Sequence, residues 1–344
     1  MLNRATMKGV CLLEAGKFAT REMPIPRPES REVLVAVKAC GICGSDVHFY
    51  EHGRIGDFVV RAPLILGHEA AGEVVAVGPD VRMLRIGDRV AMEPGIPCRR
   101  CEHCRGGRYN LCPDVVFLSS PPYDGFFCEY VALPEDFAYK LPESVSTEAG
   151  ATVEPLAVGL QAISLVGLKA GDTAVVFGAG PIGLVTVAAA RAFGATDITA
   201  VDLIPMRLDF ALRMGASRAI NAREVDVSQV LKDSADVVLD CVAVPATFQQ
   251  TFDIIKPGGR VAWVGMASDT AEVPFLKLQA KEALVTGVFR YANRFKTAVS
   301  LLASGRIDTN PLITHRFRFP DVAEAVQFAA QNRDRALKTL VTFD

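Results

Sequence analysis

The chain has 344 residues, of which 50% are hydrophobic and 22% are charged, and its formal net charge at pH 7 is -2. This length favours two domains, and the small net charge gives no electrostatic reason to expect a nucleic acid or an anionic membrane as a partner. The first residues contain no apolar run of signal-peptide length, and glycines and a proline interrupt the apolar stretch 174–192, so we expect a cytoplasmic protein without membrane spans.

The first part of the chain, from about residue 7 to 150, has the pattern of an antiparallel β domain. Its short β-like runs are separated by Gly, Pro and Asp, which favour turns. The clearest runs are 32–39, 72–77 and 89–91. We therefore expect a loop-rich β domain in this part of the chain.

Side chains that suit a catalytic zinc ion are dispersed over this part of the chain and its junction with the next part. Thiol, imidazole and carboxylate groups are all zinc ligands, and three protein ligands with one open position are typical of a catalytic site. The candidates in these segments are Cys43, Ser45, His48, His68, Glu69 and Glu154.

Each candidate also has a simpler interpretation when it is considered alone. Cys43 could be a small core residue, His68 a hydrogen-bonded polar residue, and Glu154 a partner of a helix cap. For an isolated His68 the simpler interpretation is favoured. In combination with the nucleotide-binding motif described below, the zinc interpretation becomes the better one.

Four of the nine cysteines lie within fifteen residues, and this clustering indicates a metal site rather than disulfides. At the spacing Cys-x2-Cys-x2-Cys-x7-Cys, four thiolates can close a tetrahedron around a structural zinc ion, with an iron–sulfur cluster as the alternative. The predicted ligands of this lobe, 94–114, are Cys98, Cys101, Cys104 and Cys112. Arginines of the same loop form a local basic patch, but the chain offers no wider basic face or aromatic platform, which excludes a nucleic-acid module.

Strand-like and helix-like runs alternate between about residues 153 and 288. Strand-like runs lie at 173–177, 198–201, 237–240 and 260–264, and a further strand is expected at 284–288. Helix-like segments between them include 184–193 and 205–214. The alternation predicts a parallel sheet with crossover helices. After about residue 289 we expect a helix at 295–304 and a short β-like piece at 315–319.

A glycine-rich turn follows the first of these strands, as Gly178-Ala-Gly180-Pro-Ile-Gly183. Gly178 permits the tight turn, Gly180 lets the backbone approach a pyrophosphate, and Gly183 lets the helix pack against the strand. The phosphates of a dinucleotide would then lie at the N-terminus of the helix. The motif alone is weak, but a second strand ends in an acidic residue at the expected distance.

That acidic residue is Asp202, nineteen residues after Gly183. A carboxylate at this position can accept both hydroxyls of the adenosine ribose and repels a 2′-phosphate, which favours NAD over NADP. Asp202 could instead merely cap the next helix. Arg207 weakens the preference slightly, because a guanidinium close by could serve either cofactor.

These segments together resemble the medium-chain dehydrogenase/reductase superfamily over nearly the whole chain. The landmarks are the stretches 41–48, 67–72 and 87–90, the four-cysteine loop and the glycine motif. Within this superfamily the chain is most similar to the polyol dehydrogenases, namely sorbitol (L-iditol) dehydrogenase and xylitol dehydrogenase. The stretches typical of that subgroup are 41–56, 107–111, 154–159, 287–291 and 314–317.

The resemblance implies a fold of mixed β and α/β class. A GroES-like β-barrel catalytic domain is expected over 1–152 and 290–344. A Rossmann domain with a doubly wound parallel sheet, 153–289, is expected between these two parts. The resemblance also favours a homotetramer.

The resemblance also assigns roles to individual residues. Cys43, His68 and Glu154 match the ligands of the catalytic zinc ion, and Glu69 lies beside the metal and ligates it in some members. Whether either carboxylate contacts zinc directly or through water stays open. Ser45 and His48 match the proton relay of related alcohol dehydrogenases.

Further residues are expected at the substrate and the cofactor. The substrate contacts implied by the resemblance are Phe49, Glu154, Arg290 and Tyr291. Phe49 replaces a tyrosine of the animal sorbitol dehydrogenases, which also lack the four-cysteine site, so the chain resembles microbial relatives. The cofactor contacts implied besides the three glycines and Asp202 are Pro181, Ile182, Arg207, Val242, Val264, Phe289 and Arg290.

The expected activity is oxidation of a secondary hydroxyl of a polyol, such as sorbitol, xylitol or L-iditol, to the ketose. Zinc acts as the Lewis acid, and NAD accepts the hydride. An NAD-dependent dehydrogenase of threonine, 2,3-butanediol or galactitol is the alternative. A non-catalytic NAD(H)-binding protein is a remote one, because it would not need Cys43, His68 and Glu154 together.

Overall fold

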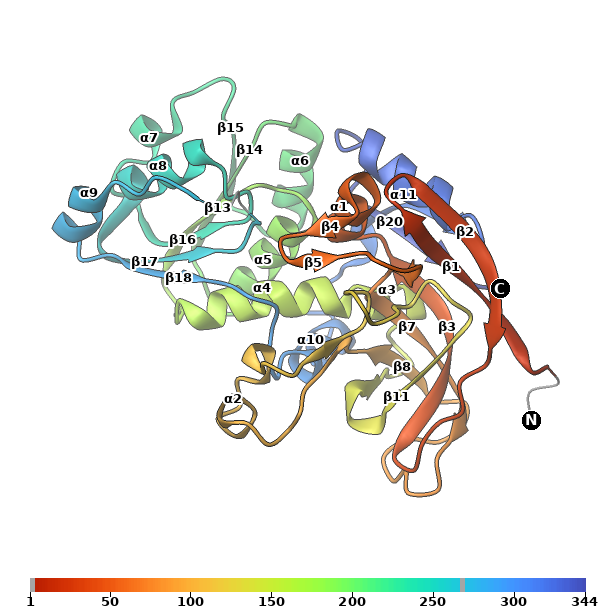
Figure 1. Ribbon diagram of the computed structural model, residues 1–344. Helices are drawn as coiled ribbons and strands as arrows, with labels where there is room; N and C mark the ends of the chain where they lie inside the picture. Colours follow the sequence, from red (N-terminus) through yellow and green to blue (C-terminus); the bar gives the residue numbers. More distant parts are fainter. Residues whose placement is uncertain (1–3, 267–269) are drawn as a thin grey trace. The chain divides into compact units, whose positions relative to one another are not determined.

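The computed structural model describes residues 4–266 and 270–344, and the chain divides into two compact units (Figure 1). The first unit comprises Met1–Glu154, Phe295–Ser304 and Thr309–Asp344. The second comprises Pro155–Arg294 and Gly305–Asp308. The second unit is therefore inserted into the first, where the sequence predicted an inserted domain over 153–289.

The first unit is built on a seven-stranded sheet with the order β12-β8-β7-β3-β20-β19, in which β11 also pairs with β3. The strands are β3 (Glu32–Gly41), β7 (Glu69–Val77), β8 (Arg89–Met92), β11 (Tyr130–Pro134), β12 (Ala138–Lys140), β19 (Ile313–Arg318) and β20 (Lys338–Thr342). The long central strands β3 and β7 carry mostly apolar residues that face the core. The structure thus shows a predominantly antiparallel β domain in this part of the chain, as the sequence predicted.

One pair of strands departs from the antiparallel pattern that the sequence predicted. β19 and β20 are parallel, whereas the other pairs of this sheet are antiparallel. The reason is the connection between them, because helix α11 (Val322–Gln331) crosses over from the end of β19 to the start of β20. β20 then pairs with β3, so the end of the chain lies beside Gly41.

Smaller elements complete the first unit. A three-stranded sheet has the order β2-β1-β6, with β1 at Thr6–Glu14, β2 at Lys17–Pro24 and β6 at Leu64–Ile65. Helix α1 (Gly44–His52) begins directly after β3, and Cys43 is its N-cap residue. The core between these elements includes the fully buried side chains of Phe126 and Phe127.

The second unit is a six-stranded parallel sheet with the order β15-β14-β13-β16-β17-β18. The strands are β13 (Thr173–Phe177), β14 (Asp197–Asp202), β15 (Arg218–Asn221), β16 (Ala235–Asp240), β17 (Ile255–Trp263) and β18 (Leu284–Gly287). The helices include α4 (Val153–Leu165), which begins at the end of the first unit, α5 (Pro181–Ala192), α6 (Pro205–Arg213), α8 (Pro245–Ile254) and α9 (Phe275–Ala280). This strand order is that of a Rossmann fold, and the order reverses between β13 and β16.

The predicted strands of this sheet are confirmed, with small changes at their ends. β13 has the predicted bounds, whereas α5 begins at Pro181 rather than at residue 184. A proline at the first position suits a helix start, because its missing N–H has no partner there, and Gly180 is the N-cap. The prediction missed β15, which is four residues long and begins with an arginine.

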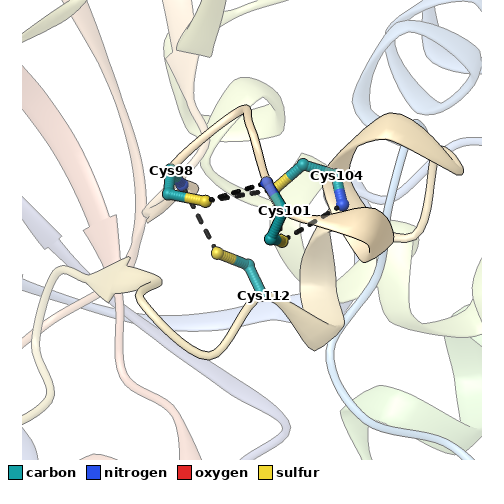
Figure 2. Close-up of side chains that lie close together, drawn as sticks. All are labelled: Cys98, Cys101, Cys104 and Cys112. Carbon is teal, nitrogen blue, oxygen red and sulfur yellow. Dashed lines mark hydrogen bonds between the residues drawn. The ribbon is translucent and has the colours of Figure 1, made fainter.

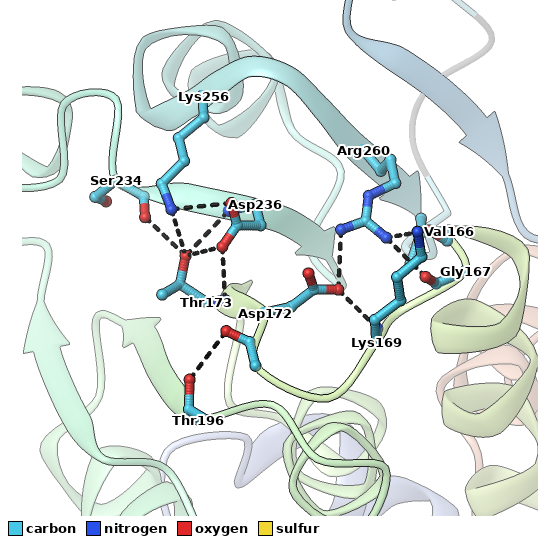
Figure 3. Close-up of polar contacts among 11 residues, drawn as sticks. Val166, Gly167, Lys169, Asp172, Thr173, Thr196, Ser234, Asp236, Lys256 and Arg260 are labelled. Carbon is cyan, nitrogen blue, oxygen red and sulfur yellow. Dashed lines mark hydrogen bonds and ion pairs between the residues drawn. The ribbon is translucent and has the colours of Figure 1, made fainter.

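A polar network ties together the N-terminal ends of three strands (Figure 3). The backbone and hydroxyl of Thr173 on β13 donate to the Asp236 carboxylate on β16, at 2.9 and 2.7 Å, and Lys256 on β17 donates to the same carboxylate at 2.9 Å. Burial acts to raise the pKa of Asp236, but these donors outweigh it and hold the pKa at about 2. The network lies at the edge opposite the glycine-rich turn, so we assign it to stability.

In the part of the chain that the structure describes, no helix combines the length and apolar character needed to cross a membrane.

Candidate zinc and nucleotide sites

The four clustered cysteines converge on one point of their loop (Figure 2). The sulfurs of Cys98, Cys101, Cys104 and Cys112 all lie within 4.8 Å of one another. The Sγ atoms of Cys101 and Cys104 are 3.3 Å apart, and those of Cys98 and Cys104 are 3.9 Å apart, which is too long for a disulfide. The short helix α2 (Glu102–Arg105) holds the middle of the loop.

The surroundings of these thiols fit a bound cation. Backbone N–H groups of Arg100 and Cys101 lower the pKa of Cys98 to about 6. Burial and the thiol of Cys101 raise the pKa of Cys104 to about 12. Without a positive charge between them the four sulfurs cannot ionise together, and a zinc ion supplies that charge. Four thiolates would leave no open position, as in a structural site.

A second potential metal-binding group is formed by Cys43, His68 and Glu69. Cys43 precedes α1, and His68 and Glu69 stand at the start of β7. One ligand atom from each lies within 4.8 Å of the other two. Cys43 is half-buried, whereas His68 and Glu69 are buried. The structure thus brings together three residues that the sequence assigned to the catalytic zinc site.

Asp46 holds the two segments of this group together. Its carboxylate accepts hydrogen bonds from the backbone N–H of Cys43 at 2.8 Å and of Gly67 at 3.1 Å. Its Oδ1 also lies 3.7 Å from Nδ1 of His68. A carboxylate on one ring nitrogen of a ligating histidine directs the other nitrogen to the metal. Sequence analysis missed this role, although Asp46 lies within a stretch that carried the resemblance.

Charge around His68 also fits a cation at this place. Burial acts to lower the pKa of His68, but the charges of Cys43 and Asp46 outweigh it and raise the pKa well above its ordinary value. The buried group therefore favours added positive charge. Cys43 and His68, with carboxylates close by, are the residues that would hold a zinc ion here.

Lys338 is a further member of this site that the sequence did not indicate. It begins β20, and its Nζ donates to both carboxylate oxygens of Glu69, at 2.8 and 2.6 Å, and to the carbonyl of Ile42 at 3.1 Å. Burial acts to lower the pKa of Lys338, but the charges of Glu69 and Cys43 keep it above its ordinary value. The ammonium group thus compensates the buried carboxylate of Glu69.

The other residues that the sequence assigned to catalysis or substrate binding in the first unit differ in burial and position. Glu154 is buried in the first turn of α4 and lies outside the group of three, but its charge contributes to the raised pKa of Lys338. Ser45 is half-buried and His48 is exposed, both on α1. Phe49, predicted to contact substrate, is buried in the hydrophobic core of the first unit.

The glycine-rich turn has the geometry that its sequence predicted. Gly178 has a φ of +82°, which favours glycine. A Cβ atom on Gly183 would lie 1.7 Å from the carbonyl oxygen of Gly178, so only glycine fits between the helix and the strand. Pro181 and Ile182 are half-buried in the first turn of α5. The N-terminus of α5 therefore offers its N–H groups as an anion site.

Asp202 lies at the end of β14, next to this turn. Its Oδ2 accepts from the backbone N–H of Ala179 at 2.7 Å, and its Oδ1 accepts from Leu203 and Ile204 at 2.7 and 3.0 Å. The capping contacts before α6 are therefore present, and the same carboxylate also reaches the glycine turn. A guanidinium nitrogen of Arg207 is 3.8 Å from Asp202.

The remaining cofactor candidates are also found in the second unit. Val242 and Val264 flank Asp240, a buried residue that sequence analysis missed and that accepts from the backbone N–H of Val242 at 2.9 Å. Arg290 has a φ of +54° and its guanidinium lies 4.7 Å from the ring centre of the exposed Phe289. Tyr291, predicted to contact substrate, is buried.

Comparisons with known proteins agree with this geometry. Residues 29–143 match the alcohol dehydrogenase GroES-like domain, and residues 181–304 match the zinc-binding dehydrogenase domain. The chain is 42% identical to a sorbitol dehydrogenase of Bacillus subtilis, over 97% of each chain. It is 44% identical to a "Probable D-xylulose reductase A" of Aspergillus clavatus, over 94% of this chain and 93% of the relative.

A solved structure supports the fold at the level of the whole chain. A dehydrogenase of unknown specificity from Escherichia coli superimposes with a TM-score of 0.95 at 37% identity, over 98% of this chain and 99% of that one. The match to the zinc-binding dehydrogenase domain, with solved neighbours bound to NADP and to NADH, supports zinc and a nicotinamide cofactor for this protein. The chain therefore belongs to the zinc-dependent medium-chain dehydrogenases, in their polyol dehydrogenase subgroup.

Proposed function

We propose that this protein oxidises one secondary hydroxyl of a polyol to the ketose, with NAD as the hydride acceptor and zinc at the group formed by Cys43, His68 and the nearby carboxylates. The observation that carries the proposal is the convergence of this thiol, imidazole and carboxylate in a buried group of an enzyme 42% identical to a sorbitol dehydrogenase. When bound, zinc supplies Lewis-acid polarisation of the hydroxyl, and the nicotinamide takes the hydride.

The protein's own residues orient the metal ligands, transfer the proton and anchor the substrate. Asp46 fixes the ring of His68 and the turn that carries Cys43, so the metal ligands are held before substrate arrives. Ser45 and His48 receive the proton that the hydroxyl loses, and the exposed position of His48 supports its transfer to water. Arg290 and Tyr291 are the proposed anchors for the other hydroxyls of the polyol.

NAD is the proposed cofactor in preference to NADP. The support is the carboxylate of Asp202, whose oxygens can accept the ribose hydroxyls and whose charge repels a 2′-phosphate. Arg207 is 3.8 Å from this carboxylate, so its charge is partly engaged by Asp202.

Two zinc ions per chain and a homotetramer complete the proposal. The two groups of ligands support one structural and one catalytic ion. The edge strand β18 carries the exposed Leu284, and α9 carries the exposed Phe275 and Leu276, which supports association through this side of the second unit. We propose a cytoplasmic location, because none of the nine cysteines, all of which lie in the described residues, forms a disulfide.

The test is the initial rate of NADH formation with a panel of alcohols, each with NAD and with NADP. The panel contains xylitol, D-sorbitol, galactitol, L-iditol, L-threonine, 2,3-butanediol and ethanol. We expect turnover of polyols with NAD. Turnover of threonine or simple alcohols alone would contradict the substrate class, and an active His68→Ala variant would contradict the zinc site.

A further inference from the structure

Two histidines lie one helical turn apart on the exposed side of α1. His48 and His52 are at positions i and i+4, so they are neighbours on the helix surface. Their ring centroids are 4.5 Å apart, and their planes are inclined by 68°. His48 is exposed, and so is 56% of the His52 side chain. Both rings are therefore accessible to solutes.

The separation of the rings matches that of two imidazoles that share a metal ion. With a metal–nitrogen distance of about 2.1 Å, two such ligands hold their ring centroids roughly 4.5 to 5.3 Å apart. The observed distance lies at the lower end of this range, so chelation requires only side-chain rotation. The backbone of the helix already sets the spacing.

A carboxylate is also present beside the pair. Oε2 of Glu51 is 4.0 Å from Nε2 of His52 and 3.5 Å from a guanidinium nitrogen of Arg333. The order of these residues, His48-x-x-Glu51-His52, is the order of a known helical zinc motif in which both histidines ligate the metal. Arg333 shares the carboxylate, so Glu51 is a weaker donor than the two rings.

We propose that His48 and His52 form an additional, exposed metal site that takes a divalent ion such as Ni²⁺, Zn²⁺ or Cu²⁺. Neutral imidazoles prefer these ions to Mg²⁺ or Ca²⁺, which take oxygen ligands. The site differs from the two zinc groups described above in its exposure and in having only two ring ligands. Binding is therefore reversible, and it tracks the free metal concentration.

Occupancy of this site has a consequence that rests on the proposed function. There, His48 accepts the proton released from the substrate through a ring nitrogen. A metal ion on that nitrogen occupies the lone pair that the proton needs, so the bound ion slows turnover. The site thus makes the enzyme sensitive to excess metal at the outer end of the relay.

The test is Ni²⁺ binding to the zinc-loaded enzyme by calorimetry at about pH 8, where histidine is neutral. Ni²⁺ is the probe because Cu²⁺ would oxidise the free thiols. We expect one additional ion per chain, and at least about tenfold weaker binding to His52→Gln, since even outer partners of metal ligands contribute that much. Glu51→Gln should change the affinity less. His315→Gln, which removes a half-buried histidine on β19, is the matched control and should bind Ni²⁺ as the parent does.

Turnover measurements then separate the two parts of the proposal. We expect Ni²⁺ to inhibit the parent enzyme reversibly on dilution and to leave His52→Gln unaffected, with the basal rates of the two equal. Equal Ni²⁺ affinity of the parent and His52→Gln would overturn the site. Binding lost in His52→Gln without inhibition of the parent would support the site and overturn its link to the relay. The polyol assay without Ni²⁺ tests the proposed function independently.

Discussion

Replacing Lys338 with methionine tests how much the buried ion pair of Lys338 and Glu69 contributes to the stability of the first unit. Lys338 is 3% exposed and Glu69 is 0% exposed, and the ammonium contacts both carboxylate oxygens at 2.8 and 2.6 Å. Methionine keeps most of the side-chain volume but leaves Glu69 as an uncompensated buried charge. Breaking a buried pair in this way costs about 3 to 5 kcal/mol. We expect a loss of this size in the local stability of β3, β7 and β20.

The assay is hydrogen exchange of peptides from these three strands, which reports the free energy of local opening. Lys140→Met is the matched control, because Lys140 pairs with Asp88 at the same distance of 2.6 Å but is 51% exposed. Water reaches the ammonium of Lys140, and Asp88, although 7% exposed, also accepts from the backbone N–H of Arg85 at 3.0 Å, so loss of Lys140 should cost less stability than loss of Lys338. The double variant Lys338→Met/Glu69→Leu removes both charges and should recover much of the stability. Equal losses in Lys338→Met and Lys140→Met would refute the argument from burial.

Three further predictions concern the other sites. Cys104→Ser should reduce the zinc content from about two ions to about one per chain and lower the unfolding temperature, with the kcat/KM of the folded enzyme retained; loss of both ions would contradict separate sites. Asp202→Gly should lower kcat/KM for NAD about tenfold or more and raise the NADP/NAD ratio, since hydrogen bonds to a charged group contribute about 1.5 to 3 kcal/mol each. Asp236→Asn should lower stability at pH 7 by about 1 to 2 kcal/mol after allowance for solvent screening. Because the pKa of Asp236 is held at about 2, below its ordinary 3.8, this contribution is complete above pH 3.8 and is lost as the pH falls toward 2. Denaturant unfolding of the parent and of Asp236→Asn across this pH range, followed by the fluorescence of Trp263 on β17, measures the difference in their free energies of unfolding. A difference that does not change with pH would contradict the prediction.

Features encoded in local sequence were predicted well. The strand 173–177, the glycine turn and the four-cysteine spacing each depend on neighbouring residues, and the structure shows the expected strand, turn and cluster. The helix α5 begins three residues earlier than predicted because Pro181 occupies its first position, where a backbone N–H is not needed. Local patterns thus indicate elements and motifs reliably where one short segment contains the whole signal.

Features that depend on distant pairing could not be predicted in this way. Lys338 reaches Glu69 only because β20 pairs with β3, about 300 residues earlier in the chain. No local sequence pattern predicts that pairing. The parallel alignment of β19 with β20 likewise depends on the crossover helix α11. The contact of Asp46 with Gly67 is a third case, because it joins segments 21 residues apart.

The pairing of β20 with β3 also orders the events of biosynthesis. The ribosome makes the second unit, Pro155–Arg294, before it makes residues 338–342, so the Rossmann sheet can form while translation continues. The amino-terminal strands of the first unit can pair with one another earlier, but its sheet cannot be completed until those residues emerge. The unit whose synthesis begins first is therefore the last to have all of its strands available.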